Sequence, residues 1–418
     1  MLTVKRIKES QELPKLLSVF IDQFFMSITT FGTTIVLART FDKFVYADFV
    51  LLISISLFVL GLQSSLISKP FSINISDYLN TSQTNFFQFN LQSKLIFTLA
   101  FILIFPIVYF LIFKDIDIKR IFFFTLFITS FSFYFFIRET MLSMRHTREN
   151  MFYGLACSIS ILAILTIIWT QGITDAFFYF AWVSLIYLCL SFIYFFRNFR
   201  NFKIPKIPKI EQKEFLKVNW KPGKWLVGTS FLYYLSVDIY PWLLLYQTTK
   251  NDVAMLGVLA SIASLTNPIL KALSSYLLPL YVRVRSDIMQ IRKLVKNWTF
   301  FFGFISLLLI LIGYYFGENI ILLFFGAKYG NVGNIVIYPF VLQAIVILFQ
   351  PFRIALTALN RTDIDFWIYI PRSIIAVGLG YVLVGKFGIY GVFYTMIVET
   401  FFYQIMLAIN YFIIAKKV

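Results

Sequence analysis

Seven candidate site residues are ionisable and lie inside long apolar runs, where bulk water cannot stabilise a charge. They are Asp22, Arg138, Asp238, Lys271, Arg353, Arg372 and Glu399. A charged side chain is costly in hydrocarbon, so it usually faces a wet cavity or a charged partner. The four cations could bind an anionic group, and arginine would do so through two parallel hydrogen bonds. The three carboxylates could carry a proton or a sodium ion, or could balance the cations.

Depth along the runs divides the basic residues. Arg138, Lys271 and Arg353 lie near the ends of their runs, from which a long side chain can also reach the lipid headgroups. Arg372 lies deeper and directly after Pro371, where the missing helix hydrogen bond permits a bend. We therefore predict Arg372 as the main anion-binding residue and Lys271 as a weaker candidate. Arg138 and Arg353 complete the predicted set.

The acidic residues have shorter side chains, so depth decides more about them. Asp238 and Glu399 lie near the middle of their runs and cannot reach the headgroups. We expect both to line a polar cavity, or otherwise to hydrogen-bond between helices. Asp22 lies about two turns into the first run. These three residues are the predicted coupling-ion or charge-balancing groups.

The composition predicts an integral membrane protein. Of the 418 residues, 59% are hydrophobic and only 14% are charged, against about 25% charged residues in a typical soluble domain. So few polar residues could not cover a soluble fold of this length, which excludes a soluble enzyme and a nucleic-acid-binding domain. A helical span needs about 20 apolar residues. Twelve runs meet that length: Leu16–Leu37, Val45–Ile67, Leu95–Phe113, Ile121–Leu142, Met151–Trp169, Ala176–Phe196, Trp225–Tyr246, Val253–Leu273, Trp298–Phe316, Ile335–Ala358, Phe366–Val384 and Gly391–Ile414.

The distribution of Lys and Arg predicts the orientation of these spans. With the N-terminus inside, the inner segments hold 27 of the 37 Lys and Arg residues and the outer segments hold eight. Bacterial-type membrane proteins keep Lys and Arg in their cytoplasmic loops. The bias therefore predicts a multi-pass membrane protein with both termini in the cytoplasm. It also accounts for the net charge of +17 without a nucleic-acid partner.

A basic segment after the sixth run predicts two halves. Residues 197–224 hold nine Lys or Arg and repeat Ile-Pro-Lys at 204–206 and 207–209, which is typical of a stiff extended linker. We therefore predict a six-helix bundle over 1–196, a cytoplasmic linker over 197–224 and a second six-helix bundle over 225–418. Both halves enter from the cytoplasm, as in parallel transporter repeats.

The chain contains no recognisable catalytic motif. It lacks a phosphate-binding GxxxxGK[ST] loop and a potassium-channel filter sequence, and every predicted outer loop is short. Two cysteines and one histidine build neither a disulfide framework nor a metal site. We expect a transporter without a cofactor or metal, not an enzyme.

Several stretches resemble the Wzx-type O-antigen or capsule repeat-unit flippases of the multidrug/oligosaccharidyl-lipid/polysaccharide (MOP) superfamily. The resemblance covers nearly the whole chain, and the order and spacing of the motifs carry it. The similar motifs are Ile35-Val36-Leu37-Ala38-Arg39 with Asp48-Phe49, Asp238 with Met255-Leu256-Gly257-Val258, LLFFGAKYG (Leu322–Gly330), LTALNRTD (Leu356–Asp363) and KFGIYGVFYTMIVET (Lys386–Thr400).

The resemblance implies an all-α membrane fold with two six-helix bundles around a central cavity, working by alternating access. The implied substrate is an undecaprenyl-diphosphate-linked oligosaccharide, and polysaccharide assembly proteins are implied partners. Transport would be coupled to a proton or sodium gradient. Three alternatives remain: a multidrug exporter of the same superfamily, a secondary transporter of another superfamily, and a membrane-embedded polysaccharide polymerase or ligase.

Overall fold

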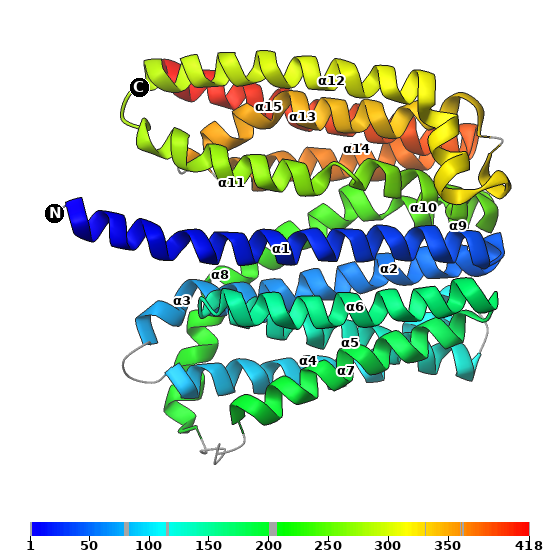
Figure 1. Ribbon diagram of the computed structural model, residues 1–418, viewed down its shortest axis with the longest axis horizontal. Coiled ribbons are helices and arrows are strands. Elements are labelled where there is room, and N and C mark those ends of the chain that lie inside the picture. The colour runs from blue at the N-terminus through cyan, green and yellow to red at the C-terminus, as the bar shows by residue number, and fades with distance from the viewer. Residues whose placement is uncertain are drawn as a thin grey trace. The chain divides into compact units, whose positions relative to one another are not determined.

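The described part of the chain is helical throughout and contains no strand (Figure 1). The computed structural model describes residues 2–78, 83–113, 117–199, 207–330, 332–359, 361 and 363–417. The all-α fold class is therefore confirmed. The helices are α1 (Leu2–Thr40), α2 (Lys43–Gln63), η1 (Ser64–Ser68), α3 (Lys69–Asn74), η2 (Ile75–Tyr78), α4 (Gln83–Phe113), α5 (Ile118–Ser143), α6 (Thr147–Gln171), α7 (Ala176–Phe199), α8 (Lys209–Tyr233), η3 (Tyr234–Asp238), α9 (Tyr240–Gln247), α10 (Lys250–Ser264), α11 (Asn267–Arg283), α12 (Ile288–Phe325), η4 (Ala327–Tyr329), η5 (Gly333–Val336), α13 (Ile337–Ala358), α14 (Asp363–Phe387) and α15 (Ile389–Lys417).

Ten helical stretches in the described residues are long and apolar enough to cross a membrane. They coincide with ten of the twelve predicted spans. The other two predictions, Trp225–Tyr246 and Val253–Leu273, fall on shorter helical pieces. The π turn η3 interrupts the first, and the second breaks between α10 and α11, just before Pro268. A π turn adds a residue to the helical register, and proline removes a backbone donor, so a single regular helix is lost at both places.

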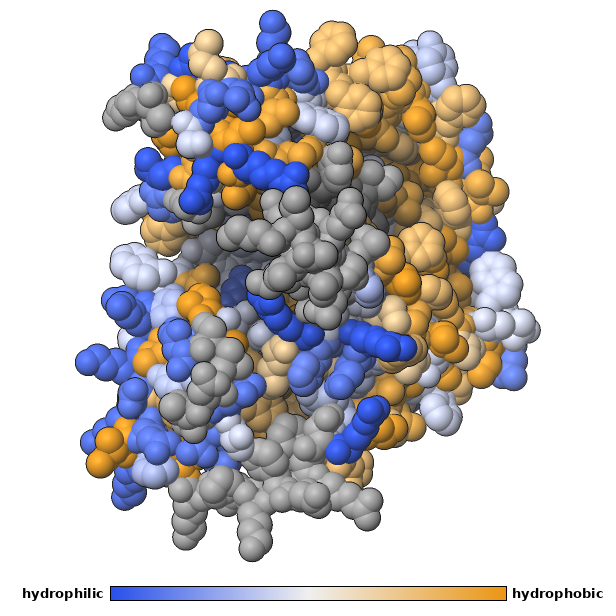
Figure 2. All heavy atoms as spheres, turned by 60° about the vertical axis from the view of Figure 1, so that its left-hand side comes forward, coloured by the Kyte–Doolittle hydropathy of each residue, from blue (hydrophilic) through white to orange (hydrophobic). Residues whose placement is uncertain are grey.

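Apolar side chains cover much of the molecular surface. Leu103, Phe300 and Ile374 are each more than two-thirds exposed. Figure 2 shows many hydrophobic side chains on the molecular surface. Such a surface is stable only against lipid or another apolar partner. This agrees with the membrane location predicted from composition.

The chain forms two compact units. Unit 1 contains Met1–Thr33 and Leu52–Phe231, and unit 2 contains Thr34–Leu51 and Leu232–Val418. In unit 1, α5 packs against α4, α6 and α7, and in unit 2, α13 packs against α11, α12 and α15 (Figure 1). The end of α1 and the start of α2 belong to unit 2, although the rest of both helices belongs to unit 1.

The segment predicted as an extended linker is largely a helix, so that prediction is wrong over residues 209–224. These residues form most of α8, while residues 200–206 lie outside the described part of the chain. Phe215 is buried against Phe86 of α4, with ring centroids 5.2 Å apart, and Asn219 donates a 2.8 Å hydrogen bond to Asn90. One face of α8 is thus part of the core of unit 1. The Lys-rich face is exposed, and lysine is compatible with a helix.

Within unit 2, the hairpin tip formed by residues 34–51 is held by an exchange of helix caps. Arg39 of α1 donates to the carbonyl oxygens of Leu323 and Phe324, at the end of α12. Lys328, just beyond α12, donates to the carbonyl oxygens of Ala38 and Phe41, at the end of α1. The last carbonyls of a helix have no partner inside the helix and attract cations. Each cation therefore satisfies the exposed end of the other helix.

The membrane orientation is a prediction that cysteine labelling can check. In a protein carrying Cys157→Ser and Cys189→Ser, we expect Lys213→Cys to react with an impermeant maleimide only after the cells are opened. Lys213 is exposed on α8, so burial would not prevent its reaction. Asn251→Cys, exposed at the start of α10 in a predicted outer segment, should react in intact cells. The reverse pattern would contradict the predicted orientation.

Candidate functional site

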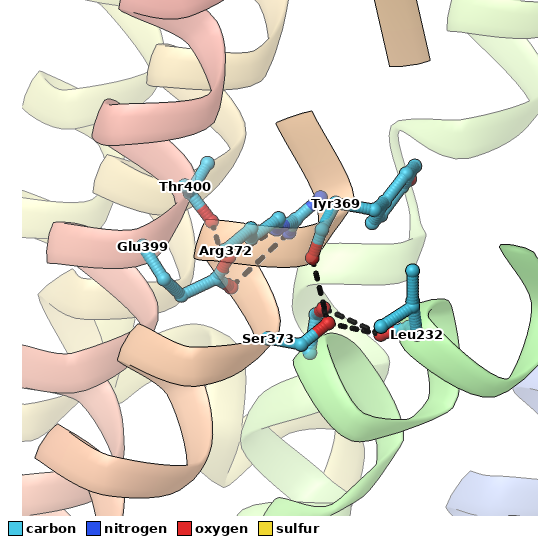
Figure 3. Close-up of polar contacts among 7 residues, drawn as sticks. Leu232, Tyr369, Arg372, Ser373, Glu399 and Thr400 are labelled. Carbon is cyan, nitrogen blue, oxygen red and sulfur yellow. Dashed lines mark hydrogen bonds and ion pairs between the residues drawn. The ribbon is translucent and has the colours of Figure 1, made fainter. Parts of the chain in front are cut away.

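A buried arginine–carboxylate pair lies in unit 2. Arg372 of α14 contacts Glu399 of α15 through both arms of its guanidinium, Nε to Oε2 and Nη2 to Oε1, the latter at 3.1 Å. Thr400 donates a further 3.2 Å hydrogen bond to Oε1. Figure 3 shows Glu399 and Thr400 on one helix facing Arg372 on the next. Both charged side chains are buried, so each charge is compensated chiefly by the other.

Tyrosine rings surround this pair. The Arg372 guanidinium carbon lies 4.6 Å from the ring centroid of Tyr403 and 5.3 Å from that of Tyr369. The rings of Tyr369 and Tyr403 are 5.3 Å apart, and Tyr233 lies 6.0 Å beyond Tyr369. Aromatic faces attract a guanidinium cation. The cluster therefore holds a cation between two buried rings, Tyr369 and Tyr403, whereas the ring of Tyr233 is exposed.

A second arginine lies at the same tyrosines. Arg353 of α13 interacts electrostatically with Tyr403, Tyr369 and Asp365. Asp365 accepts a 2.9 Å hydrogen bond from the Tyr403 hydroxyl. Arg353 is exposed whereas Arg372 is buried. One cation of the cluster is thus open to an incoming group, and the other is occupied by Glu399. We call these residues (Arg353, Asp365, Tyr369, Arg372, Glu399, Tyr403) the arginine–tyrosine cluster.

Asp238 is half-buried at the end of the π turn η3. This turn packs on α14 through Ser236, which lies 2.9 Å from the Ser373 hydroxyl. Ser373 also donates to the carbonyl oxygen of Leu232 at 2.9 Å (Figure 3). π turns expose backbone groups and occur often at functional sites. Asp238 therefore lies beside the helix that carries Arg372.

Unit 1 contains another buried pair. Arg138 of α5 donates to Asp22 Oδ2 of α1 at 2.5 Å and to the Tyr134 hydroxyl at 3.0 Å. Asn150 of α6 donates to the same Asp22 oxygen at 3.0 Å. Asp22 is 1% exposed and Arg138 is 3% exposed. Asp22 thus connects three helices, α1, α5 and α6, and Arg138 does not extend to the headgroups.

A glycine makes room for this pair. A Cβ atom on Gly154 would lie 2.0 Å from Asp22 Oδ1 and 2.7 Å from Arg138 Nη1. Any side chain at this position would therefore displace the ion pair. Tyr153, the neighbouring residue, stacks on Tyr134 with ring centroids 4.9 Å apart. The unit 1 pair is enclosed by glycine, asparagine and tyrosine.

The structure brings some of the predicted site residues together and separates others. Within the units, Arg372 lies with Glu399 and Arg353, and Arg138 lies with Asp22. The side chain of Lys271 lies outside the described part of the structure, although its backbone belongs to α11. Tyr369, Tyr403, Asp365 and Gly154 were not predicted. Tyrosine and phenylalanine are so frequent in this chain that no sequence signal singles out the two tyrosines.

The comparisons with known proteins identify the fold. No protein-family profile and no curated protein matches the chain in sequence. Among solved structures, an inward-facing multidrug resistance MATE family transporter of the MOP superfamily is similar, with a TM-score of 0.74, 12% identity and coverage of 94% of both chains. The lipid II flippase MurJ, in an inward closed conformation, has a TM-score of 0.72 and 12% identity over 94% of this chain and 87% of its own. A MOP superfamily transporter from Pyrococcus furiosus has a TM-score of 0.63 and 13% identity over 96% of this chain and 94% of its own. The chain therefore shares the fold of MOP superfamily transporters and flippases.

Proposed function

We propose that this protein is a flippase for undecaprenyl-diphosphate-linked oligosaccharide repeat units in O-antigen or capsule synthesis. It would move them from the inner to the outer leaflet of the bacterial inner membrane by alternating access. A proton or sodium gradient would drive the exchange, with Asp238 and Glu399 as the carriers. Polysaccharide assembly proteins would receive the product.

The arginine–tyrosine cluster is the observation that supports this proposal. A lipid-linked diphosphate carries about two negative charges that cannot cross hydrocarbon without compensation. Arg353 is accessible and Arg372 lies at the same two tyrosines. Two arginines can bind a diphosphate through several charge-assisted hydrogen bonds, and the exposed ring of Tyr233, beside Tyr369, can stack on a sugar ring. The similar fold of the lipid II flippase adds support, since that protein is also named for a lipid-linked substrate.

Glu399 would act as a replaceable ligand of Arg372. In the absence of substrate it occupies both arms of the guanidinium. A phosphate group bound first at Arg353 would replace it, because both ligands present oxygen atoms at a similar spacing. An unpaired carboxylate in that position is costly, so Glu399 would return to Arg372 when the substrate leaves.

A MATE-like multidrug exporter is the alternative function. The similarity to a MATE family transporter and the half-buried carboxylate of Asp238 support it. A binding site for lipophilic cations needs acidic groups that are not neutralised by the protein. Asp22 and Glu399 are each held by an arginine, which favours an anionic substrate.

A reconstitution experiment distinguishes the two functions. Proteoliposomes would contain undecaprenyl diphosphate carrying a short oligosaccharide, with the glycan exposed to an impermeant glycosidase on one side. We expect the protected fraction of the lipid to become digestible when the protein is present. Tetraphenylphosphonium, as a lipophilic cation, should not be transported by the same vesicles. Transport of the cation without movement of the lipid would support the exporter and refute the flippase.

Arginine substitutions test the cluster. Arg372→Ala removes two charge-assisted hydrogen bonds of about 1.5–3 kcal/mol each, so lipid movement should fall at least roughly ten-fold. Arg372→Lys keeps the charge but loses the planar fork, and should also impair movement. Arg361→Ala is the matched control, because Arg361 forms only an exposed ion pair with Asp363. Normal movement with Arg372→Ala and Arg372→Lys would remove Arg372 from the site.

Paired substitutions separate structural from functional ion pairs. Removing one partner of a buried pair destabilises by about 3–5 kcal/mol, whereas replacing both with apolar residues is often neutral. We expect Asp22→Leu with Arg138→Met to recover the thermal stability lost in either single variant, and to retain lipid movement. Arg372→Met with Glu399→Leu should recover stability but not movement. If lipid movement is normal in both double variants, neither ion pair binds substrate.

A further inference from the structure

Unit 1 contains a second buried polar network, at the junction of α2, η1, α4 and α5. Its centre is Lys94 of α4, which is 1% exposed. The Lys94 ammonium donates to the Ser132 hydroxyl of α5. The rings of Phe97 and Phe133 lie 5.6 and 5.9 Å from it. A lysine is almost never buried this completely without a charged partner.

Gln63 and the π turn η1 extend this network toward a carboxylate. Ser132 donates to Gln63 Oε1 at 2.9 Å, and Gln63 Nε2 donates to the Ser68 hydroxyl at 2.9 Å. Ser64, on the same π turn, donates to Glu139 Oε1 at 2.9 Å. The turn therefore contributes two serines to the network. Ser68 binds the Gln63 amide, which is connected to Lys94 through Ser132, and Ser64 binds Glu139.

Glu139 is only partly satisfied in this arrangement. Its Oε2 atom is buried and has no hydrogen-bond partner among the described residues. Ser68 of η1, Lys69 of α3 and Lys94 of α4 also interact with Glu139, but no ion pair of the described residues includes it. Arg138, the preceding residue, is occupied by Asp22.

The remaining elements packed on α5 bring no other charge to Glu139. The charged residues of α6 and α7 in this part of unit 1, Arg148, Glu149 and Arg197, are exposed and take no part in its interactions. The two lysines favour the ionised carboxylate, whereas burial and the unpartnered oxygen favour the neutral acid. This balance is what a group needs in order to gain and lose a proton readily.

We propose that Glu139 and Lys94 form a proton-binding site in unit 1, in which Glu139 accepts the proton and Lys94 supplies the opposing charge. The proton comes from water and adds to a carboxylate oxygen, which gives a neutral carboxylic acid. A sodium ion would bind poorly here, because the nearby Lys94 ammonium would repel a second cation.

The π turn connects this site to α8. Ser65 of η1 and Ser230 of α8 are hydrogen-bonded at 2.6 Å, and Gly223 of α8 lies beside Ser65. The chain passes from unit 1 to unit 2 within α8, after Phe231. Loss of charge at Glu139 would weaken the Ser64 hydrogen bond, and the effect should reach η1 and α8 first. If the protein is a proton-coupled flippase, Glu139 would be one of its coupling sites. The proton-binding site itself does not depend on which substrate is transported.

Infrared difference spectroscopy of the full protein in lipid vesicles, without substrate, tests the site. Lowering the pH should produce a carboxylic-acid carbonyl band that Glu139→Gln removes and that the exposed control Glu149→Gln retains. Lys94→Met should change the midpoint pH of this band, whereas Lys94→Arg should leave it in place. Replacing potassium with sodium should not affect it. A band that persists in Glu139→Gln, or a midpoint that responds to sodium, overturns the proposal.

A second variant keeps the test valid if Glu139→Gln does not fold. Glu139→Asp keeps a carboxyl group, so the band should remain at a changed frequency. An unchanged band in Glu139→Asp would assign the band to another residue.

Hydrogen exchange examines the link to α8. At a single neutral pH, exchange in Glu139→Gln should be faster than in wild type at residues 64–68 and 209–233, and unchanged in Glu149→Gln. Unchanged exchange at those residues would refute the link. If the wild-type protein moves no lipid, the proposed function is wrong, but the proton-binding site is still tested by the carbonyl band.

Discussion

A charge buried in hydrocarbon must be compensated within the protein, and this constraint shapes both units. Each unit buries an arginine and pairs it with a carboxylate from another helix, Arg138 with Asp22 and Arg372 with Glu399. Apolar surfaces alone provide little preference between helix faces in lipid, because the lipid is equally apolar. A buried ion pair does provide one, since separating it leaves two uncompensated charges. The pairs therefore determine which faces of α1 and α5, and of α14 and α15, meet.

The two pairs differ in what surrounds them. The unit 1 pair is enclosed by Asn150, Tyr134 and the surface of Gly154, and leaves no space for a ligand. The unit 2 pair lies at the same tyrosines as the exposed Arg353. An equivalent ion pair can thus be structural in one environment and exchangeable in another. Access to the surrounding groups, more than the pair itself, distinguishes a helix contact from a binding site.

Composition and periodicity predicted the helical membrane fold because hydrophobicity over about 20 residues is a strong local signal. They could not predict where a helix is interrupted by a π turn, since Ser64–Ser68 and Tyr234–Asp238 contain no proline or glycine. Depth along a run identified Arg372 and Glu399, but pairing depends on helix packing between residues distant in the chain. Lys94 directly precedes the apolar run Leu95–Phe113, so the pattern did not include it in a span, whereas α4 begins at Gln83. The linker prediction failed at 209–224, where burial of Phe215 and Asn219 outweighed the local charge pattern.

The exchange of helix caps at the hairpin tip has a consequence for synthesis. Arg39 and its acceptor Phe324 are 285 residues apart in the sequence. At about 5–20 residues per second, a ribosome needs roughly 15–60 seconds to make that intervening chain. Throughout this interval the carbonyls at the end of α1 lack Lys328, although α1 and α2 are the first helices to enter the membrane. The first hairpin must therefore remain unfinished at its tip until nearly four-fifths of the protein has been made, and water or lipid headgroups must solvate it meanwhile.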